Sequence, residues 1–176
     1  MITTEQIHNA RILIVDDEPA NVMLLEQMLK QEGYTSVHSL TDPREAAAQY
    51  RTINPELVLL DLNMPHMNGF QVLEQLKEIE KEYYAPVMIL TAQPDHQTRI
   101  NALDAGAKDF LSKPFDLLEV SIRIRNMLEV RLLNNQVLLY NQMLADKVQG
   151  CSVDLAAAQL RLEHEMFREE GSPEEP

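Results

Sequence analysis

Four apolar runs of the sequence are each followed by polar residues, and the types of these residues suggest phosphoryl chemistry. The runs lead into Asp16-Asp17-Glu18, Asp61, Thr91 and Lys113. If the runs are neighbouring parallel strands, these side chains meet at the carboxyl edge of one sheet, where open α/β sheets place their ligand sites. Clustered carboxylates repel one another and therefore need a cation, and a neighbouring lysine binds phosphoryl oxygens. The residues thus predict a magnesium-dependent aspartyl-phosphate site.

Short β-type runs alternate with helical patterns over residues 10–130, which indicates parallel βαβ units. The strands are almost continuously apolar, as expected when helices cover both faces of a sheet. We therefore predict an α/β fold: a flavodoxin-like, doubly wound, five-stranded parallel sheet with five helices, the last extended into a coiled-coil-like arm. The expected strands are 11–16, 34–40, 57–61, 86–91 and 108–112, and the expected helices lie near 19–33, 44–51, 70–79 and 95–105 and from 116 onward.

The chain divides into four predicted parts. Residues 1–9 are an N-terminal extension, 10–130 form the α/β domain, 131–168 form the helical arm, and 169–176 form an acidic tail. We expect the tail to be disordered because it is polar, highly charged and rich in Glu and Pro. The arm is predicted to be one long helix because the chain from Phe115 to Gln149 contains no Gly or Pro.

Apolar residues repeat along the arm at alternating spacings of three and four, as in a coiled coil. They are Val130, Leu133, Val137, Tyr140 and Leu144. Beyond these the apolar row shifts, in the form of a stutter that locally unwinds a coiled coil, and Gly150 at the shift is expected to break or weaken the helix. We favour a homodimer through this helix. The alternative is a single amphipathic helix packed back on the domain.

The composition excludes several classes of function. A net charge of -13 argues against direct nucleic-acid binding, which demands a basic face. The longest apolar runs are too short to span a bilayer, and the first residues do not form a secretory signal. We therefore expect no membrane association and a cytoplasmic location. One cysteine cannot form an internal disulfide, and the scattered histidines do not have metal-ligand spacing.

Four motifs resemble those of two-component response-regulator receiver domains, which are CheY-like. They are Asp16-Asp17-Glu18, Asp61-Leu62-Asn63-Met64-Pro65, Thr91-Ala92 and Lys113-Pro114-Phe115. The resemblance covers residues 10–130, and its specificity comes from all four motifs standing in order at the expected strand ends. It implies a phosphorelay protein that takes a phosphoryl group from the histidine of a sensor kinase or phosphotransfer protein, with Mg²⁺ as cofactor.

The resemblance also implies a role for each site residue. Asp61 is the expected phosphoacceptor, Asp17 a direct Mg²⁺ ligand, Asp16 a ligand mainly through water, the Asn63 carbonyl a further ligand, and Thr91 and Lys113 bind phosphoryl oxygens. Taken singly, these residues also suit a helix cap, a turn, strand packing or a solvated surface. Their joint pattern favours the phosphoryl site.

Phe110, three residues before Lys113, resembles the aromatic switch of the family. The resemblance implies that the hydroxyl of Thr91 moves toward the phosphoryl group and that the aromatic ring then turns inward. This reshapes the face formed by helix 95–105, strand 108–112 and the helix from 116. A phenylalanine that merely packs in the core is the alternative.

No output domain is evident after residue 130, which leaves two interpretations open. The chain is either a phosphorylation-controlled interaction module or the regulatory N-terminal part of a larger enzyme, such as a cyclic-di-GMP phosphodiesterase. Residues 128–147 resemble the helical linker that follows the receiver in regulators carrying such a phosphodiesterase domain. By itself the chain is expected to be a regulator, with only self-phosphorylation and self-dephosphorylation chemistry. A flavodoxin-like redox role is excluded, since no phosphate-cradling loop follows the first strand.

Overall fold

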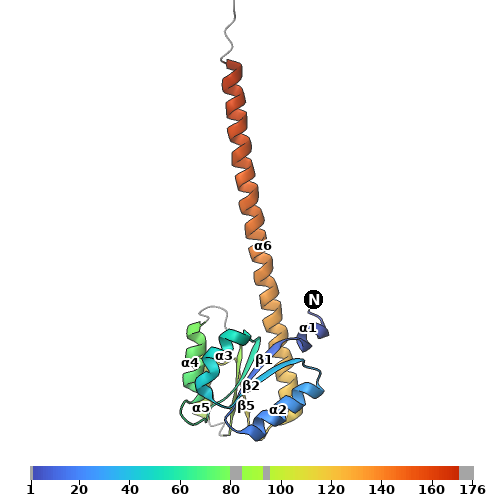
Figure 1. The fold of residues 1–176 in the computed structure, drawn as a ribbon, viewed down its shortest axis with the longest axis vertical. Helices are drawn as coiled ribbons and strands as arrows, with labels where there is room; N and C mark the ends of the chain where they lie inside the picture. Colours follow the sequence, from blue (N-terminus) through green and yellow to red (C-terminus); the bar gives the residue numbers. More distant parts are fainter. Residues whose placement is uncertain (1, 80–84, 93–95, 171–176) are drawn as a thin grey trace, which may run out of the picture. The chain divides into compact units, whose positions relative to one another are not determined.

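The computed structural model describes residues 2–79, 85–92 and 96–170, without the side chains of 151, 153, 154 and 162–170. The chain falls into two units, Met1–Leu133 and Asn134–Pro176. The first unit holds a sheet with helices around it (Figure 1). The second unit consists of the later part of the last helix.

The sheet contains five strands in the order β2-β1-β3-β4-β5, and every neighbouring pair is parallel. The strands are β1 (Arg11–Val15), β2 (Ser36–Leu40), β3 (Leu57–Asp61), β4 (Val87–Thr91) and β5 (Asp109–Ser112). The register pairs Asp61 with Leu90 and Thr91 with Ser112. The carboxyl ends of the central strands therefore lie at one edge of the sheet.

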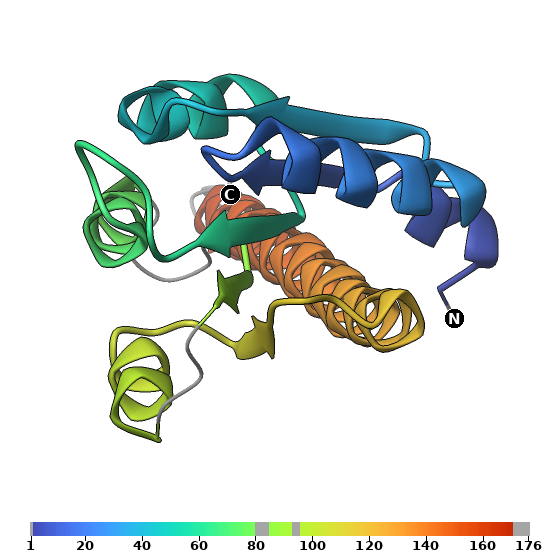
Figure 2. The same ribbon diagram turned by 90° about the horizontal axis from the view of Figure 1, so that it is seen from below.

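Helices cover both faces of this sheet, as Figure 2 shows. They are α2 (Pro19–Gln31), α3 (Ala46–Ile53) after the 3-10 turn η1 (Pro43–Glu45), α4 (Gly69–Ile79), α5 (His96–Asp104) and α6 (Leu117–Glu170). Alternate β1 residues point to opposite faces: Ile12 and Ile14 pack with α2 and the start of α6, whereas Leu13 and Val15 pack with α3 and α4. The predicted doubly wound α/β fold is confirmed.

One helix was not predicted. Part of the expected N-terminal extension forms α1 (Thr4–His8), so the described residues contain six α-helices rather than five. Thr3 and Gln6 form a reciprocal capping box at its start, which satisfies backbone groups that a short helix otherwise leaves exposed. Ile7 is buried in the core, and this contact fixes the short helix on the domain.

The last helix, α6, continues from Leu117 to Glu170 and passes through Gly150 without a break. A glycine inside a helix costs only about 1 kcal/mol relative to alanine, and long helix-favouring flanks offset that cost. Within the first unit, Val120, Ile124 and Leu128 of α6 are fully buried in the core. Residues 171–176 of the predicted disordered tail lie outside the described residues.

Candidate functional site

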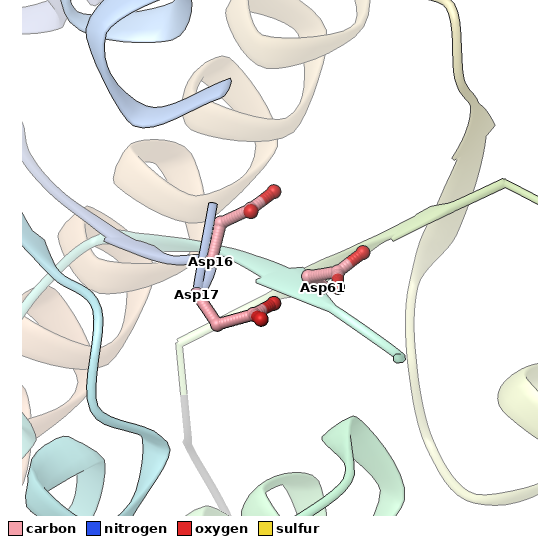
Figure 3. A group of neighbouring side chains, drawn as sticks. All are labelled: Asp16, Asp17 and Asp61. Atoms are coloured by element: carbon pink, nitrogen blue, oxygen red, sulfur yellow. The ribbon is translucent and has the colours of Figure 1, made fainter. Parts of the chain in front are cut away.

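The acidic residues lie where the strand order reverses. From β1 the chain passes outward to β2, and it then returns to form β3 on the other side of β1. Such a switch point leaves a crevice at the carboxyl ends of the two strands. Asp16 and Asp17 directly follow β1, and Asp61 is the last residue of β3 (Figure 3). The topology therefore brings together carboxylates that are far apart in the sequence.

The three carboxylates form a compact cluster, with one ligand oxygen from each within 4.8 Å of the others. Asp16 is 0% exposed and Asp61 is 3% exposed, whereas Asp17 is half-buried. Burial of like charges at this separation is unfavourable unless a cation lies among them.

Lys113 supplies one positive charge to the cluster. Its Nζ lies 2.8 Å from Asp16 Oδ2 and 2.8 Å from Asp61 Oδ1. Its backbone N–H donates to the Thr91 carbonyl at 2.8 Å, which continues the β4–β5 pairing and aims the side chain at the crevice. Desolvation lowers the pKa of Lys113, but its hydrogen bonds to the two carboxylates outweigh this effect and raise the pKa overall. The lysine is therefore a permanent cation of the site.

The Asp61 carboxylate is held but not fully neutralised. Burial raises the pKa of Asp61, the Lys113 hydrogen bond and charge oppose that rise, and the charges of Asp16 and Asp17 add to it, so that the pKa lies above its ordinary value. Oδ1 is bound by Lys113, and Oδ2 accepts the backbone N–H of Asn63 at 3.2 Å. Both oxygens thus have fixed positions before any reaction.

Asp16 and Asp17 differ in how their carboxylates are engaged. Asp16 accepts the Glu18 backbone N–H at 3.0 Å, the Asn21 side-chain amide at 3.2 Å and the Lys113 ammonium. Within the described part of the chain, no hydrogen bond reaches the Asp17 carboxylate. Asp17 therefore has the more available oxygens. The Asn21 contact was not anticipated, because it depends on how α2 turns after β1.

Thr91 ends β4 beside the cluster and is 2% exposed. Next to it lies a hollow of about 190 Å³. Its lining consists of Leu62, Asn63, Asn68, Phe70, Thr91 and Thr98. The Thr91 end of β4 therefore lies at the same edge of the sheet as Asp61 and lines this hollow. Ala92, which follows Thr91, is small and exposed.

Gly69, the first residue of α4, is a site residue that the sequence analysis did not identify, since the helix was expected to begin at residue 70. A Cβ at this position would overlap the Asp61 carbonyl oxygen and lie 2.9 Å from the Leu62 Cα. Its N–H also donates to the Leu62 carbonyl at 3.0 Å. Only a residue without a side chain lets α4 approach the Asp61 backbone so closely. The Asn68-Gly69 pair, seven and eight residues after Asp61, was the available signal.

Phe110 does not belong to the acidic cluster. It lies in β5, half-buried against the core on the side of α5. The guanidinium carbon of Arg99, in α5, lies 3.9 Å from the centre of its ring. The predicted arm residues are all 46–59% exposed, and they are Val130, Leu133, Val137, Tyr140 and Leu144.

The donor set of the cluster fits a magnesium ion. Three carboxylates face one lysine, so negative charge exceeds positive charge. All side-chain ligands on offer are oxygens, which Mg²⁺ prefers, and the half-exposed Asp17 leaves room for the waters that this ion retains.

Comparison with known proteins assigns the family. The response regulator receiver domain family matches residues 12–125. The chain belongs to this family. The match begins in β1 and ends in the first turns of α6, so it contains every residue of the acidic cluster, together with Lys113, Thr91 and Phe110.

Three relatives illustrate the similarity. Response regulator PleD of Caulobacter vibrioides is 38% identical over 129 residues, which are 73% of this chain and 28% of PleD. A receiver domain of a sensor histidine kinase from Pseudomonas aeruginosa was solved with magnesium in its active site cleft. It is 28% identical to this chain with a TM-score of 0.63, and the match covers 69% of this chain and 98% of that structure's chain. CheY of Borrelia burgdorferi, solved with CheX, BeF3 and magnesium, is 33% identical over 66% of this chain and 87% of its own, with a TM-score of 0.62.

These matches establish a receiver domain and a role in phosphorylation-based signalling. The chain spans 28% of the length of PleD, so the activities of whole relatives do not transfer with the domain. In the part of the chain that the structure describes, no helix has both the length and the apolar character needed to cross a membrane.

Proposed function

We propose that this receiver accepts a phosphoryl group on Asp61 from the histidine of a sensor kinase or phosphotransfer protein, in a magnesium-dependent reaction. The observation that carries the proposal is the shared contact of Lys113, 2.8 Å from both Asp16 and Asp61, inside a cluster of three carboxylates. Such a site combines a nucleophile with surplus negative charge and a fixed cation, which suits phosphoryl transfer by positioning and charge stabilisation.

In the proposed step an Asp61 oxygen attacks phosphorus, an O–P bond forms, and the N–P bond of the phosphohistidine breaks with its electron pair going to the histidine nitrogen. Lys113 and the Asn63 N–H fix the two oxygens of the attacking carboxylate. As the acyl phosphate forms, Lys113 exchanges its contact with Asp61 for one with a phosphoryl oxygen. Thr91, at the end of the adjacent strand, donates its hydroxyl to another oxygen.

Four residues would hold the metal: Asp16, Asp17 and Asp61 through carboxylates, and Asn63 through its backbone carbonyl. When bound, Mg²⁺ supplies positive charge that screens the carboxylates from the incoming phosphoryl group. Asp17 is the expected direct ligand because its carboxylate is the least engaged. The three contacts of Asp16 with Glu18, Asn21 and Lys113 suit a role through water.

We infer that phosphorylation is read out on the face formed by α5, β5 and the start of α6. Thr91 and Phe110 are the proposed switch residues, and Phe110 lies in the edge strand β5, where it pairs with Ile89 of β4. Movement of the Thr91 hydroxyl toward Asp61 would open space on this side of the sheet for the Phe110 ring.

We also propose that the arm pairs with a second copy of the chain. The predicted arm residues Val130, Leu133, Val137, Tyr140 and Leu144 are 46–59% exposed although four of the five are aliphatic. Their spacing is that of a coiled-coil seam. Between residues 134 and 161 the sequence has two acidic and two basic residues, so two copies would approach without net repulsion.

A second candidate is that the chain is the regulatory part of a larger enzyme, such as a cyclic-di-GMP phosphodiesterase. The observation that favours it is length, because the matching relatives extend beyond the receiver. In either case we propose a cytoplasmic regulator that does not itself bind nucleic acid, since the net charge is -13 and duplex binding needs a basic surface.

The test combines phosphotransfer with mass in solution. The Asp61→Asn variant should accept no phosphoryl group from a cognate kinase or from a small phosphodonor, while wild type should. Light scattering is then run with magnesium, with and without beryllofluoride, on both proteins. Dimerisation of wild type alone on adding beryllofluoride would link the arm to the switch, whereas dimers throughout would make the arm constitutive. Phosphorylation that survives in Asp61→Asn would overturn the assignment.

A further inference from the structure

Arg99 covers the outer side of the proposed switch residue. Its guanidinium carbon lies 3.9 Å from the centre of the Phe110 ring, well inside the range of a cation–π contact. Arg99 is exposed and Phe110 is half-buried, so the stack lies at the surface. Among the described residues no carboxylate forms an ion pair with Arg99, and the Phe110 ring is the partner that its guanidinium contacts there.

The sheet register shows which way the ring can turn. Phe110 pairs with Ile89, two residues before the pair of Thr91 with Ser112. Residues two apart on a strand point to the same face, so Phe110 and Thr91 are on one face, with Thr91 nearer the carboxyl edge. The hollow of about 190 Å³ is lined by Thr91 and by Thr98 of α5, and Phe110 lies outside that lining.

A ring that turns toward Thr91 therefore leaves its place under the guanidinium of Arg99. The two arrangements exclude each other because the ring occupies either the surface position below Arg99 or the space near Thr91. Phenylalanine has no hydroxyl with which to form a hydrogen bond at the surface position, so a stacked cation is the available polar interaction there.

We propose that Arg99 is a positioning residue that holds Phe110 in its outward position and thereby sets how readily phosphorylation turns the switch. The inference rests on the proposed function, because it concerns the regulation of the Asp61 site. It adds a residue outside the phosphoryl site and a contact between the side chains of α5 and β5.

The expected effect follows from the strength of such contacts. An exposed cation–π pair shifts an equilibrium by about two- to fivefold. If the outward position predominates in the unphosphorylated protein, removing the pair raises the fraction with the ring inward by that factor. A ligand that binds the inward state then binds more tightly by the same factor.

The experiment measures the affinity for beryllofluoride at saturating magnesium in wild type, Arg99→Gln and Arg99→Lys. We expect Arg99→Gln to bind about two- to fivefold more tightly, and Arg99→Lys to lie between it and wild type, since lysine keeps the charge but not the planar stack. Arg51→Gln, which removes an exposed arginine from α3, is the matched control and should equal wild type.

A second readout tests the contact itself. NMR of the metal-free protein should show ring-current shifts of the Arg99 side-chain protons in wild type, and these shifts should disappear in Phe110→Leu and decrease when beryllofluoride and magnesium are added. Thermal unfolding of the Arg99 variants should stay within the range of ordinary surface substitutions.

The outcomes separate this inference from the function on which it rests. Wild-type protein that does not bind beryllofluoride at all would overturn the phosphoacceptor proposal and this inference together. Normal binding with equal affinities in wild type and Arg99→Gln would overturn only the role of Arg99. If Arg51→Gln bound beryllofluoride as tightly as Arg99→Gln does, the role of Arg99 would also be overturned, because the effect would then come from net charge.

Discussion

The carboxyl edge of the sheet and the arm of α6 differ in how far their side chains are buried. At the sheet edge, Asp16 and Asp61 are almost fully buried and are bound by groups from other strands. In the arm, every residue from 141 to 150 is exposed, and its large apolar side chains are 49–69% exposed. The polar groups of the first region are satisfied by the chain itself, whereas the second region presents apolar side chains to solvent, which is the surface that the proposed pairing would cover.

The two regions also differ in their charge balance. The sheet edge concentrates three carboxylates around one lysine, an imbalance that a cation or phosphoryl chemistry can use. Residues 134–161 of the arm are balanced, with Asp146 and Asp154 against Lys147 and Arg161. The charged centre suits a small charged ligand, and the proposed pairing of the arm would place one uncharged apolar seam against another.

Removing the lysine should give the largest effect. Lys113→Ala leaves the Asp16 and Asp61 carboxylates buried without their cation, and breaking a buried pair costs about 3–5 kcal/mol. Urea unfolding at pH 7 without magnesium measures the loss, and the response to phosphorylation should vanish as well. Lys30→Ala, an exposed lysine on α2, is the control. A fully stable and responsive Lys113→Ala variant would remove Lys113 from the site.

A charge in the proposed seam tests the other region. Val137→Asp should weaken dimerisation by about 100-fold, because an unpaired carboxylate would be desolvated in the interface. Leu139→Asp changes an equally exposed leucine outside the seam and should have a much smaller effect. Sedimentation or light scattering over a concentration series measures both. Equal weakening by the two variants would contradict the seam, and a monomeric wild-type arm at high concentration would exclude it.

A glycine-to-alanine substitution should change stability in opposite directions in the two regions. Gly69→Ala adds a Cβ that collides with the Asp61 backbone, and overpacking of this kind costs about 1–3 kcal/mol. Gly150→Ala adds a Cβ that meets nothing within 4 Å, so helix propensity alone should stabilise α6 by about 1 kcal/mol. Denaturant unfolding of the first and helix content of the second by circular dichroism check the contrast. A neutral Gly69→Ala would show that α4 can move away from Asp61.

The smallest effect concerns the charge of Asp61 itself. Because burial raises its pKa above the ordinary value of 3.8, the folded state disfavours the charged form. The carboxylate therefore lowers stability progressively as pH rises through 3.8 and then through the raised value. Asp61→Asn should raise the melting temperature by a few degrees at pH 7 without magnesium, and the difference should fade below pH 3.8. Asp104→Asn, exposed on α5, is the control; a destabilised Asp61→Asn would contradict the sign.

The sequence predicted those features that depend on local patterns. Alternating apolar runs and helical stripes were enough for the five-stranded parallel sheet, because burial on both faces makes each strand nearly continuous in apolar residues. The capping box of Thr3 and Gln6 could have revealed α1, since it is a local signal. Gly150 was expected to break or weaken the helix; a break is wrong, because α6 continues through Gly150 and propensity is a weak influence inside a long helix, whereas weakening stays a prediction.

The contacts within the site depend on tertiary structure and were less predictable. Polar residues at the ends of β1, β3 and β4 were expected to meet, since parallel strands align their carboxyl ends. The sharing of Lys113 between Asp16 and Asp61, the approach of Gly69 to the Asp61 backbone and the stack of Arg99 on Phe110 depend on how loops and helices pack. The Asn68-Gly69 pair was a sequence signal for the Gly69 approach, whereas no spacing in the sequence encodes the other two contacts.

The position of Asp61 in the sheet has a consequence for amide hydrogen exchange. Asp61 belongs to β3, which lies between β1 and β4 and is buried at every residue. Phe110 belongs to β5, an edge strand in which Leu111 is buried and the other three residues are partly or fully exposed. Local opening is rarest in central strands and commoner at edges. The reacting carboxylate thus stands on the slowest-exchanging strand and the responding ring on a faster one, so the amides of β5 rather than those of β3 would record the state of Asp61.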